Sequence, residues 1–259
     1  MTSTTFPATR DHTAVVTGAG SARGIGRATA HALAASGWNV AILDIDEASA
    51  KDAAHEVAEA HGVEAVGVAC DVTDETSVAQ ALATVDGSLP PVGALVNNAG
   101  VTSPVPFLEV SGEEGERVFA VNVRGAFHAT RAVATGMAER GFGRIVFLSS
   151  VSAERGGGVF GGVAYSAAKA AQLGFARALG RELGPVGVTV NSVAPGLIDT
   201  DITAGKLGAE KEATLLAGVP VGRKGTTDDV ADLITYLCRP ESGYITGATY
   251  DVNGGSHIH

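Results

Sequence analysis

Tyr165 and Lys169 are the residues whose types and spacing most directly imply chemistry. They lie four positions apart in a segment rich in helix formers, YSAAKAAQLGFAR, so their side chains share one helix face. A free phenol has a pKa of about 10, and a neighbouring ammonium group lowers it by favouring the phenolate. Such a pair could be a general acid/base for an alcohol or ketone. Most YxxxK pairs are solvated helix surface, so the context must decide.

The sequence predicts the elements that position this pair. Strands are expected at residues 13–17, 38–43, 63–69, 93–96, 144–148, 188–193 and 248–252. Helices are expected at residues 25–36, 46–61, 74–85, 111–139, 165–183 and 227–237. Apolar strands that alternate with helices imply a parallel sheet covered on both faces. We therefore expect one α/β domain, a doubly wound Rossmann-type fold of about seven strands, over residues 1–259. Residues 1–12 would be a flexible arm, and 197–222 would cover the substrate.

Local signals predict several helix ends. Asp46 can cap a helix that ends at Gly62, since aspartate favours the first position and glycine the position after the last. The run 111–114, SGEE, is typical of a capping box. Thr227 is a candidate cap for the last helix.

Composition excludes several classes of function. The 259 residues carry a net charge of −10, which argues against nucleic acid or an anionic membrane as partner. No apolar run approaches the length of a membrane span, and no signal pattern precedes residue 12, so we expect a cytoplasmic protein. Cys70 and Cys238 are predicted to be buried free thiols. The seven histidines show no metal-ligand spacing, so no metal is expected.

Polar motifs fall where the predicted strands end, and ligands bind at that edge of such sheets. The glycines of 18–26 follow the first strand, where backbone and helix N-terminus can approach a pyrophosphate. Asp44 ends the second strand and could bind both ribose hydroxyls of an adenosine; the alternative is a helix cap. Asp71 ends the third strand near the expected adenine, but a turn role is nearly as plausible.

These motifs together resemble the short-chain dehydrogenase/reductase family over about residues 13–255. The resemblance rests on Thr17-Gly18…Gly24-Ile25-Gly26, Asp71-Val72, Asn97-Asn98-Ala99-Gly100, Val121-Asn122-Val123, Ser149-Ser150, Tyr165…Lys169, Asn191 and Pro195-Gly196. No single piece is specific, but their order and spacing together are.

The resemblance implies roles for individual residues. Tyr165 would be the acid/base; Lys169 would lower its pKa and bind the nicotinamide ribose. Ser150 would hold the substrate oxygen, and Asn122 would anchor a chain of waters to solvent. Asn98 would lie along the cofactor, whereas Asn97 is expected to be structural. The cofactor-binding set is Gly18, Ser21, Arg23, Gly24, Ile25, Asp44, Asp71, Val72, Asn98, Gly100, Tyr165, Lys169, Ile198 and Thr200.

Two departures from the family pattern leave alternatives open. Five residues separate Gly18 from Gly24 where the family usually has three, so either Ser21 or Arg23 could contact the phosphate. Fourteen residues separate Ser150 from Tyr165 instead of the usual twelve. Ser152 would keep the usual count, but Ser150 follows its strand closely and is preferred.

The expected function is an oxidoreductase that moves a hydride between NAD(H) and a secondary alcohol or ketone. Asp44 favours NAD, whereas Arg23 could attract the 2′-phosphate of NADP. The alternatives are an NADPH-dependent 3-oxoacyl thioester reductase and a catalytically idle, cofactor-sensing binding protein. Residues 101–107, 152–160 and 201–219 should frame the pocket of a small substrate. By family habit, the protein should be a homotetramer.

Overall fold

The computed structural model describes residues 8–201 and 208–258. It contains a seven-stranded sheet in the order β3-β2-β1-β4-β5-β6-β7, with every neighbouring pair parallel. The strands are β1 (Thr13–Thr17), β2 (Asn39–Asp44), β3 (Ala65–Ala69), β4 (Val92–Asn97), β5 (Gly143–Leu148), β6 (Val188–Pro195) and β7 (Thr249–Val252). The predicted doubly wound α/β fold is confirmed.

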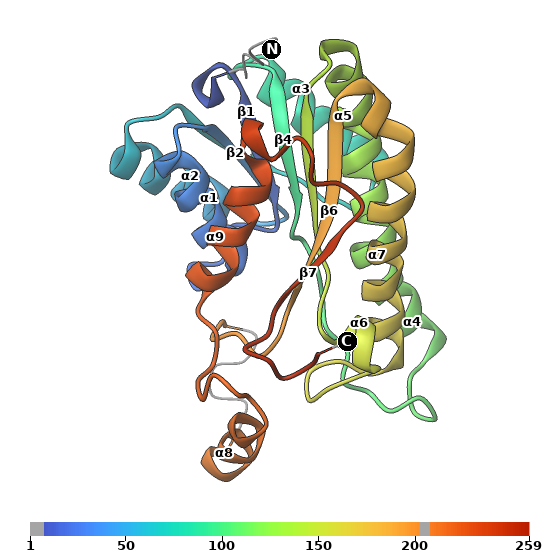
Figure 1. Cartoon of the computed structure of the whole chain (residues 1–259). Coiled ribbons are helices and arrows are strands. Elements are labelled where there is room, and N and C mark those ends of the chain that lie inside the picture. The colour runs from blue at the N-terminus through green and yellow to red at the C-terminus, as the bar shows by residue number, and fades with distance from the viewer. Residues whose placement is uncertain (1–7, 202–207, 259) are drawn as a thin grey trace.

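Helices cover both faces of this sheet, with α1, α2 and α9 on one side and α5 and α7 on the other (Figure 1). The helices are α1 (Ile25–Ala35), α2 (Glu47–His61), α3 (Glu75–Asp86), α4 (Gly112–Phe119), α5 (Ala126–Arg140), α6 (Ser152–Arg155), α7 (Val163–Leu183), α8 (Ala209–Ala217) and α9 (Thr227–Cys238). Short 3₁₀ turns are η1 (Thr9–Asp11), η3 (Gly184–Val186) and η4 (Pro240–Ser242), and η2 (Ala120–Gly125) is a π-helical turn. Helix α8 lies apart from the sheet, at its carboxyl end (Figure 1).

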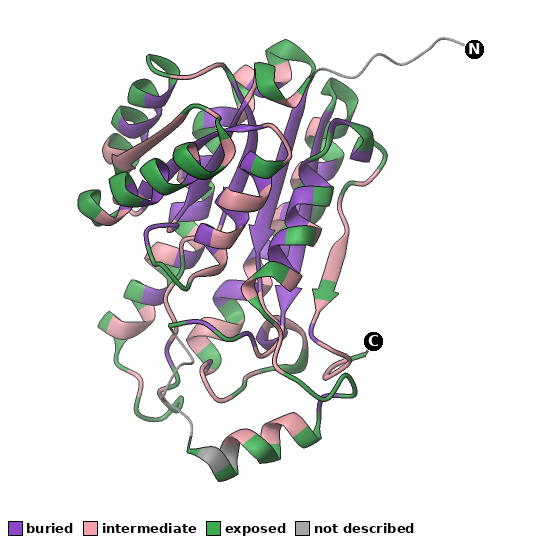
Figure 2. Cartoon of the chain, turned by 90° about the vertical axis from the view of Figure 1, so that its left-hand side faces the viewer, coloured by how far each residue is buried: buried purple, intermediate pink, exposed green. Residues whose placement is uncertain are grey.

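The sheet supplies both cores because alternate residues of a strand point to opposite faces. In β1, Ala14 and Val16 pack with Trp38 in the cluster under α1, α2 and α9. Val15 lies between them and packs with Phe147 in the cluster under α3, α5 and α7. The central strands are consequently buried along their length (Figure 2), which explains why they appear in the sequence as continuous apolar runs.

Helix ends agree with the predictions in some places and differ in others. Asp46 caps α2 by accepting a hydrogen bond from the Ser49 N–H at 2.7 Å, and Gly62 ends that helix with φ +67°. The cap of α9 is Thr226 rather than Thr227, because Thr226 and Asp229 form the reciprocal capping box.

The predicted helix over 111–139 is three segments: α4, η2 and α5. Ser111 accepts the Glu114 N–H at 3.1 Å, but the Glu114 carboxylate binds Arg117 rather than returning to Ser111. Only half of the predicted capping box therefore forms, because an arginine within reach is the stronger partner for the carboxylate.

The predicted arm over residues 1–12 differs from the structure at residues 8–12. Thr9 Oγ1 donates to the Ser36 carbonyl at 3.0 Å, and Asn39 Nδ2 donates to the Arg10 carbonyl at 2.9 Å. These bonds hold η1 against the amino end of the sheet. The rest of the predicted arm, residues 1–7, lies outside the described part of the chain.

Both cysteines are free and buried, as predicted. Burial raises the pKa of the Cys70 thiol to about 11 and that of Cys238 to about 12, so both are protonated and unreactive near neutral pH. In the part of the chain that the structure describes, no helix combines the length and apolar character needed to cross a membrane.

Candidate active site

A cleft of about 500 Å³ lies at the carboxyl ends of the strands, where the sheet order reverses between β1 and β4. This is the position at which doubly wound sheets bind ligands. Most of the predicted site residues line it: Gly18, Ser21, Gly24, Ile25, Asp44, Asp71, Val72, Asn98, Gly100, Ser150, Tyr165, Lys169, Ile198 and Thr200. Arg23 and Asn122 do not belong to this lining. The segment predicted to cover the substrate contributes Leu197, Asp201, Leu215 and Val219 as well, and its residues 202–207 lie outside the described part.

Tyr165, Lys169 and Ser150 converge in the centre of the cleft. Tyr165 and Lys169 lie one turn apart on α7, with Lys169 Nζ 5.8 Å from the centroid of the phenol ring. Ser150 follows β5 and hydrogen-bonds with the Tyr165 side chain. The Ser152 N–H donates to Ser150 Oγ at 3.1 Å, which fixes the direction of that hydroxyl. Ser152 lines the cleft too, so the structure brings both candidate serines to the site.

The pKa shifts at this site differ from the sequence-based expectation. Burial raises the pKa of Tyr165, and its hydrogen bond with Ser150 lowers that pKa by a smaller amount. Burial also lowers the pKa of Lys169 to about 7, so near neutral pH this lysine is only partly charged. The expected lowering of the Tyr165 pKa by Lys169 is therefore not the dominant effect in the ligand-free protein. Desolvation disfavours both charged forms more than the pair favours them.

Lys169 is held in position by acceptors that surround its buried ammonium group. Its Nζ donates to the Leu148 carbonyl at 2.5 Å and lies 3.5 Å from Gln172 Oε1. Ser149 Oγ donates to the Lys169 carbonyl at 2.9 Å, which ties α7 to the end of β5. The lysine is consequently oriented before any ligand binds.

Asn122 lies behind the cleft, in the π-helical turn η2. Its Nδ2 donates to the carbonyls of Val101 and Val118, each at 2.9 Å. Gln172 Nε2 donates to the main-chain carbonyl of Asn122 at 2.8 Å. Asn122 Oδ1 is buried and accepts no hydrogen bond from any residue that the structure describes. A Cβ on Gly100 would lie 2.8 Å from this oxygen and 3.3 Å from Lys169 Nζ, so both atoms border the same small space. Such π-turns are frequent at functional sites.

The glycine loop between β1 and α1 leaves main-chain groups free at the cleft. Gly18 has φ +63°, and a Cβ there would lie 2.6 Å from Ala99 Cα, so only glycine fits. Helix α1 begins after Gly24 without a side-chain cap, which leaves the N–H groups of its first turn available to an anion. Arg27, which is buried, donates to the carbonyls of Ala19 and Gly20 and so supports the loop from behind.

Asn98 and Asn97 face in different directions from the end of β4. Asn98 Nδ2 donates to the carbonyls of Thr17 and Gly18 at 2.8 and 2.7 Å, so this side chain fastens the glycine loop to β4. Asn97 Nδ2 donates to Thr130 Oγ1 at 3.0 Å on the side of α5. Asn97 therefore has a structural position, and Asn98 lines the cleft while it holds the loop.

Asp44 and Asp71 lie at the end of the cleft where an adenosine is expected. Asp44 accepts the Gly20 N–H on Oδ2 at 2.8 Å and the Asp46 N–H on Oδ1 at 3.2 Å. Each of these oxygens keeps a further lone pair for a ligand hydroxyl. One oxygen of Asp71 accepts both the N–H and the hydroxyl of Thr73, so Asp71 takes the predicted turn role and lines the cleft as well.

Ser21 and Arg23 reach across the cleft mouth to the segment after β6. Ser21 Oγ donates to Asp201 Oδ2 at 2.7 Å. Arg23 Nη2 lies 3.3 Å from Asp199 Oδ1, and its Nε lies 3.9 Å from Asp201 Oδ1. All three charged side chains are about half exposed, so the ion pairs are weak individually. They nevertheless direct Arg23 toward the segment after β6.

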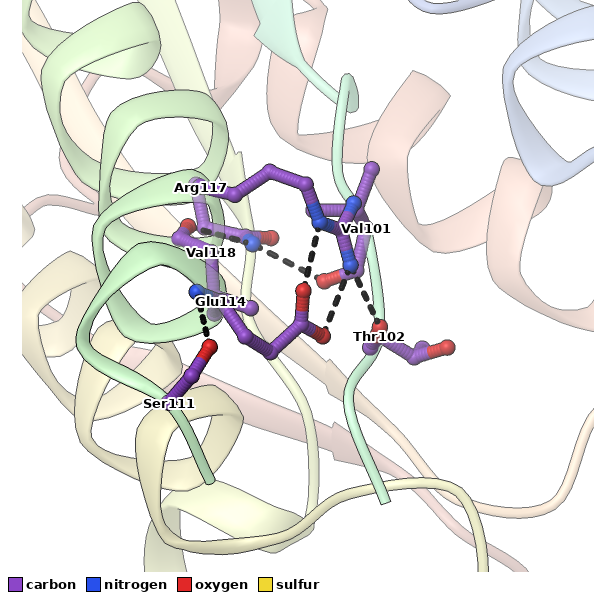
Figure 3. Close-up of polar contacts among 7 residues, drawn as sticks. Val101, Thr102, Ser111, Glu114, Arg117 and Val118 are labelled. Atoms are coloured by element: carbon purple, nitrogen blue, oxygen red, sulfur yellow. Dashed lines mark hydrogen bonds and ion pairs between the residues drawn. The ribbon is translucent and has the colours of Figure 1, made fainter. Parts of the chain in front are cut away.

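A second ion pair holds the loop that follows β4. Glu114 binds Arg117 through both carboxylate oxygens at 2.8 and 2.9 Å, and Arg117 Nη2 donates to the Thr102 carbonyl at 3.4 Å (Figure 3). The bonds from Arg117 hold the pKa of Glu114 at about 2. This pair connects α4 to Thr102, which lines the cleft. Sequence reasoning treated Glu114 as part of a cap and missed this contact.

The residues of the cleft fit a dinucleotide. The glycine loop and the uncapped start of α1 suit a pyrophosphate, and Asp44 at the end of β2 suits a ribose diol. Lys169 and the buried Asn122 Oδ1 flank Gly100 at the other end, where a second ribose could be held. The glycine loop, Asp44 and Gly100 stand at the carboxyl ends of β1, β2 and β4, so the fold itself places these groups together.

Comparisons with known proteins agree with this geometry. A sequence model of the family described as Enoyl-(Acyl carrier protein) reductase matches residues 18–257. A short-chain type dehydrogenase/reductase of Sinorhizobium fredii, y4mP, is 47% identical over 247 residues, which are 95% of this chain and 98% of that protein. The 3-oxoacyl-[acyl-carrier-protein] reductase FabG of Aquifex aeolicus is 40% identical over 236 residues, or 91% and 94% of the two chains.

Solved structures show the same relationship. A Beutenbergia cavernae protein assigned as an NAD(P)-dependent gluconate 5-dehydrogenase, with bound NADP at low occupancy, is 36% identical with a TM-score of 0.87. The match covers 95% of this chain and 96% of that one. Fold and cleft define a nicotinamide-dependent oxidoreductase. The chain belongs to the short-chain dehydrogenase/reductase family.

Sequence reasoning missed two residues that support the site. Gln172 joins Lys169 to the Asn122 carbonyl, and its position one turn after Lys169 on α7 was the available signal. Arg27, in the first turn of α1, gave a weaker signal in the sequence. Its contacts are with the main-chain carbonyls of the glycine loop, which no side-chain pattern reports. Arg155, in the predicted pocket segment 152–160, does line the cleft, but no sequence pattern named a ligand for it.

Proposed function

We propose that the protein is an NAD-dependent oxidoreductase that interconverts a secondary alcohol and a ketone. The observation that carries this proposal is the meeting of Tyr165, Ser150 and Lys169 in one cleft whose far end holds Asp44. The first three groups handle a substrate oxygen and its proton, and the carboxylate suits an adenosine ribose. A binding protein without catalysis would not need all of these groups.

The chain's own residues manage the proton of the reaction. In oxidation, Tyr165 as phenolate takes the proton of the substrate hydroxyl while Ser150 donates a hydrogen bond to the substrate oxygen. In reduction, Tyr165 returns the proton to the forming alkoxide. A bound nicotinamide supplies the hydride acceptor or donor. Lys169 Nζ and Asn122 Oδ1, which border the space beside Gly100, offer a donor and an acceptor through which the proton can leave.

The direct test is to incubate the protein with NAD and a panel of secondary alcohols, polyols and hydroxy acids, and to follow the nicotinamide absorbance. Turnover of any member supports the proposal. Tight NADH binding in a fluorescence titration without turnover of any alcohol or ketone, with NAD(H) or NADP(H), would instead support the idle, cofactor-sensing protein.

The geometry around Asp44 favours NAD over NADP. Two main-chain N–H groups hold its carboxylate in place, so it cannot turn away easily from a 2′-phosphate, which it would repel. Arg23, the residue that could attract this phosphate, is directed toward Asp199 and Asp201. Moving Arg23 to the ribose would break these ion pairs.

We therefore predict that kcat/KM is at least about tenfold higher with NAD than with NADP, a difference of roughly 1.4 kcal/mol. Asp44→Ala should narrow this ratio, because it removes a ribose ligand of NAD and the charge that repels NADP. Asp199→Asn with Asp201→Asn should narrow it by improving NADP alone, because Arg23 is then released. Equal or better activity of the unmutated protein with NADP would show that Arg23 outweighs Asp44.

A second candidate is an NADPH-dependent 3-oxoacyl thioester reductase. The 40% identity with the Aquifex aeolicus FabG over 236 residues favours it, as does the related structure with bound NADP. The net charge of −10 disfavours an acidic carrier protein as the donor of the substrate. Reduction of a 3-oxoacyl thioester with NADPH, at a higher kcat/KM than any free ketone with NADH, would establish this second candidate.

We also propose that the protein is a homotetramer whose subunits pair through α5 and α7. Ala167, Gly174 and Ala178 are exposed on one face of α7, and small residues let two helices approach closely in a symmetric interface. Ala168 is buried within the subunit and is not available for this contact. The exposed rings of Phe119 and Phe127 extend the apolar surface. Light scattering at micromolar concentration should return about four times the mass of 25.9 kDa; a monomer mass contradicts the proposal.

A further inference from the structure

The substrate end of the cleft has one unusual feature, a cationic side chain on an otherwise apolar wall. Its described lining is largely aliphatic or aromatic: Val101, Val151, Val159, Phe160, Leu215 and Val219. Among the lining residues of the whole cleft that the structure describes, Arg155 and Lys169 are the cations. Lys169 is held by the Leu148 carbonyl and Gln172 and is proposed above to serve the cofactor, which leaves the Arg155 guanidinium to interact with a substrate.

The backbone around Arg155 presents its guanidinium to the cleft. Arg155 ends the one-turn helix α6, and Gly156 and Gly157 follow with φ +75° and +107°, which turns the chain back on itself. The Arg155 Nε donates to the Gly157 carbonyl at 3.3 Å, so one edge of the guanidinium is held by its own loop. Among the described residues, no carboxylate forms an ion pair with Arg155.

Two glycines show that Arg155 and Tyr165 belong to the same wall of the cleft. A Cβ on Gly158 would lie 3.3 Å from Arg155 Nη2 and 3.5 Å from Ser152 Oγ. A Cβ on Gly161 would lie 3.2 Å from the same Ser152 Oγ and 2.5 Å from Tyr165 Cδ1. Ser152 therefore lies near both the guanidinium and the phenol ring, and all three side chains line the same cleft.

We propose that the substrate is a secondary alcohol or ketone that also carries a carboxylate, and that Arg155 binds this carboxylate. The inference rests on the proposed function and names its substrate class, a hydroxy acid or the corresponding oxo acid. A guanidinium binds a carboxylate through two parallel hydrogen bonds. In a protein of net charge −10, a free anion needs such a local cation to enter the cleft. The apolar wall would hold the carbon chain between the two groups.

The test compares 3-hydroxy acids with their methyl esters and their thioesters, as substrates for the NAD-dependent reaction. These series keep the reacting alcohol and change only the charge or the bulk at the other end. We expect kcat/KM to be at least about tenfold higher for an acid than for its methyl ester, as a charge-assisted pair implies. Arg155→Gln should lower this ratio at least about tenfold, mainly through KM, and Arg155→Lys should restore part of it.

Arg10→Gln is the matched control, because this substitution removes the same charge from a residue that is exposed at the opposite end of the sheet. It should leave the ratio of acid to ester unchanged. If Arg155→Gln does not fold, two other measurements make the same comparison of a charged with an uncharged end group. One is the ratio of acid to ester for Arg155→Lys, and the other is competitive inhibition of the unmutated protein by an alkanoate and by its amide. Turnover of esters or thioesters at least as good as that of the acids would overturn this inference and leave the proposed function standing. No turnover of any alcohol or ketone with either cofactor would overturn both.

Discussion

Tyr165→Phe is expected to lower kcat by about 10²–10⁴-fold, the contribution typical of a positioned acid/base, while NADH binding stays nearly unchanged. The variant removes one oxygen atom and keeps the ring, which packs against Gly161. Ser150, which hydrogen-bonds with the phenol, would still be available to the substrate oxygen. The proton would lose its carrier, whereas the cofactor would keep its other expected ligands, among them Lys169 and Asp44. Steady-state kinetics and a fluorescence titration with NADH measure the two effects separately.

The matched control is Tyr244→Phe, because Tyr244 is fully exposed and lies outside the cleft. It should leave both kcat and NADH binding unchanged. A Tyr165→Phe variant that retains more than a tenth of the wild-type kcat would remove Tyr165 from the role of acid/base. A large loss of NADH affinity in that variant would show instead that the phenol oxygen is mainly a cofactor ligand.

The pH dependence of the unmutated protein follows from the same geometry. Because burial raises the pKa of Tyr165, little phenolate is present at neutral pH in the ligand-free protein. Oxidation of an alcohol needs the phenolate, so its kcat/KM should rise with pH through the neutral and alkaline range. Reduction of a ketone needs the phenol and should not show that rise.

The fold was predictable because its signals are local and repeated along the chain. Each buried strand is a short apolar run, and each is followed by a polar or glycine-rich turn at the carboxyl end of the sheet. The sequence alone places Asp44 beside the glycine loop, because parallel strands bring their carboxyl ends to one edge. Position at a strand end also favoured Ser150 over Ser152, whereas the pairing of Ser150 with Tyr165 was implied by the family resemblance.

Other features depend on contacts between residues far apart in sequence, which no local pattern reports. Arg23 is directed by Asp199 and Asp201, about 180 positions away in the chain, and the sequence alone offered only its proximity to a phosphate. The π-helical turn at Asn122 interrupts a stretch that reads as one continuous helix. The expected lowering of the Tyr165 pKa by Lys169 differs from the structure for a related reason: the spacing of the two residues was visible in the sequence, but the burial of both side chains was not.

Lys169→Met is the second variant with a large expected effect, because it removes the ammonium group and keeps most of the length of the side chain. Hydrogen bonds to a charged group contribute about 1.5–3 kcal/mol, so we expect NADH affinity to fall by about 10–100-fold. The rate should fall as well, since the same group borders the proposed path of the proton beside Gly100. Lys51→Met is the control, because Lys51 is an exposed residue of α2 that pairs with Glu47. An unchanged NADH affinity in Lys169→Met would remove this lysine from the cofactor site.

The same variant tests the burial of the Lys169 charge without any ligand or substrate. Burial lowers the pKa of this lysine to about 7 in the folded protein, whereas an unfolded chain has a value of about 10.4. Between these values the unfolded chain binds more protons, so the free energy of unfolding of the wild type gains up to about 1.4 kcal/mol per pH unit. The cost of the buried charge is fully present below about pH 7 and declines as the pH rises.

Methionine at position 169 has no such cost. The methionine also leaves the Leu148 carbonyl and Gln172 without a donor. The difference in Tm between the two proteins at any one pH is therefore less informative than the change of that difference with pH. The Tm of the wild type relative to Lys169→Met should therefore rise by several degrees from about pH 6.5 to about pH 8.5, at about 2–4 °C per kcal/mol for a domain of this size. A constant difference in Tm across that range would mean that Lys169 keeps an ordinary pKa in the folded protein.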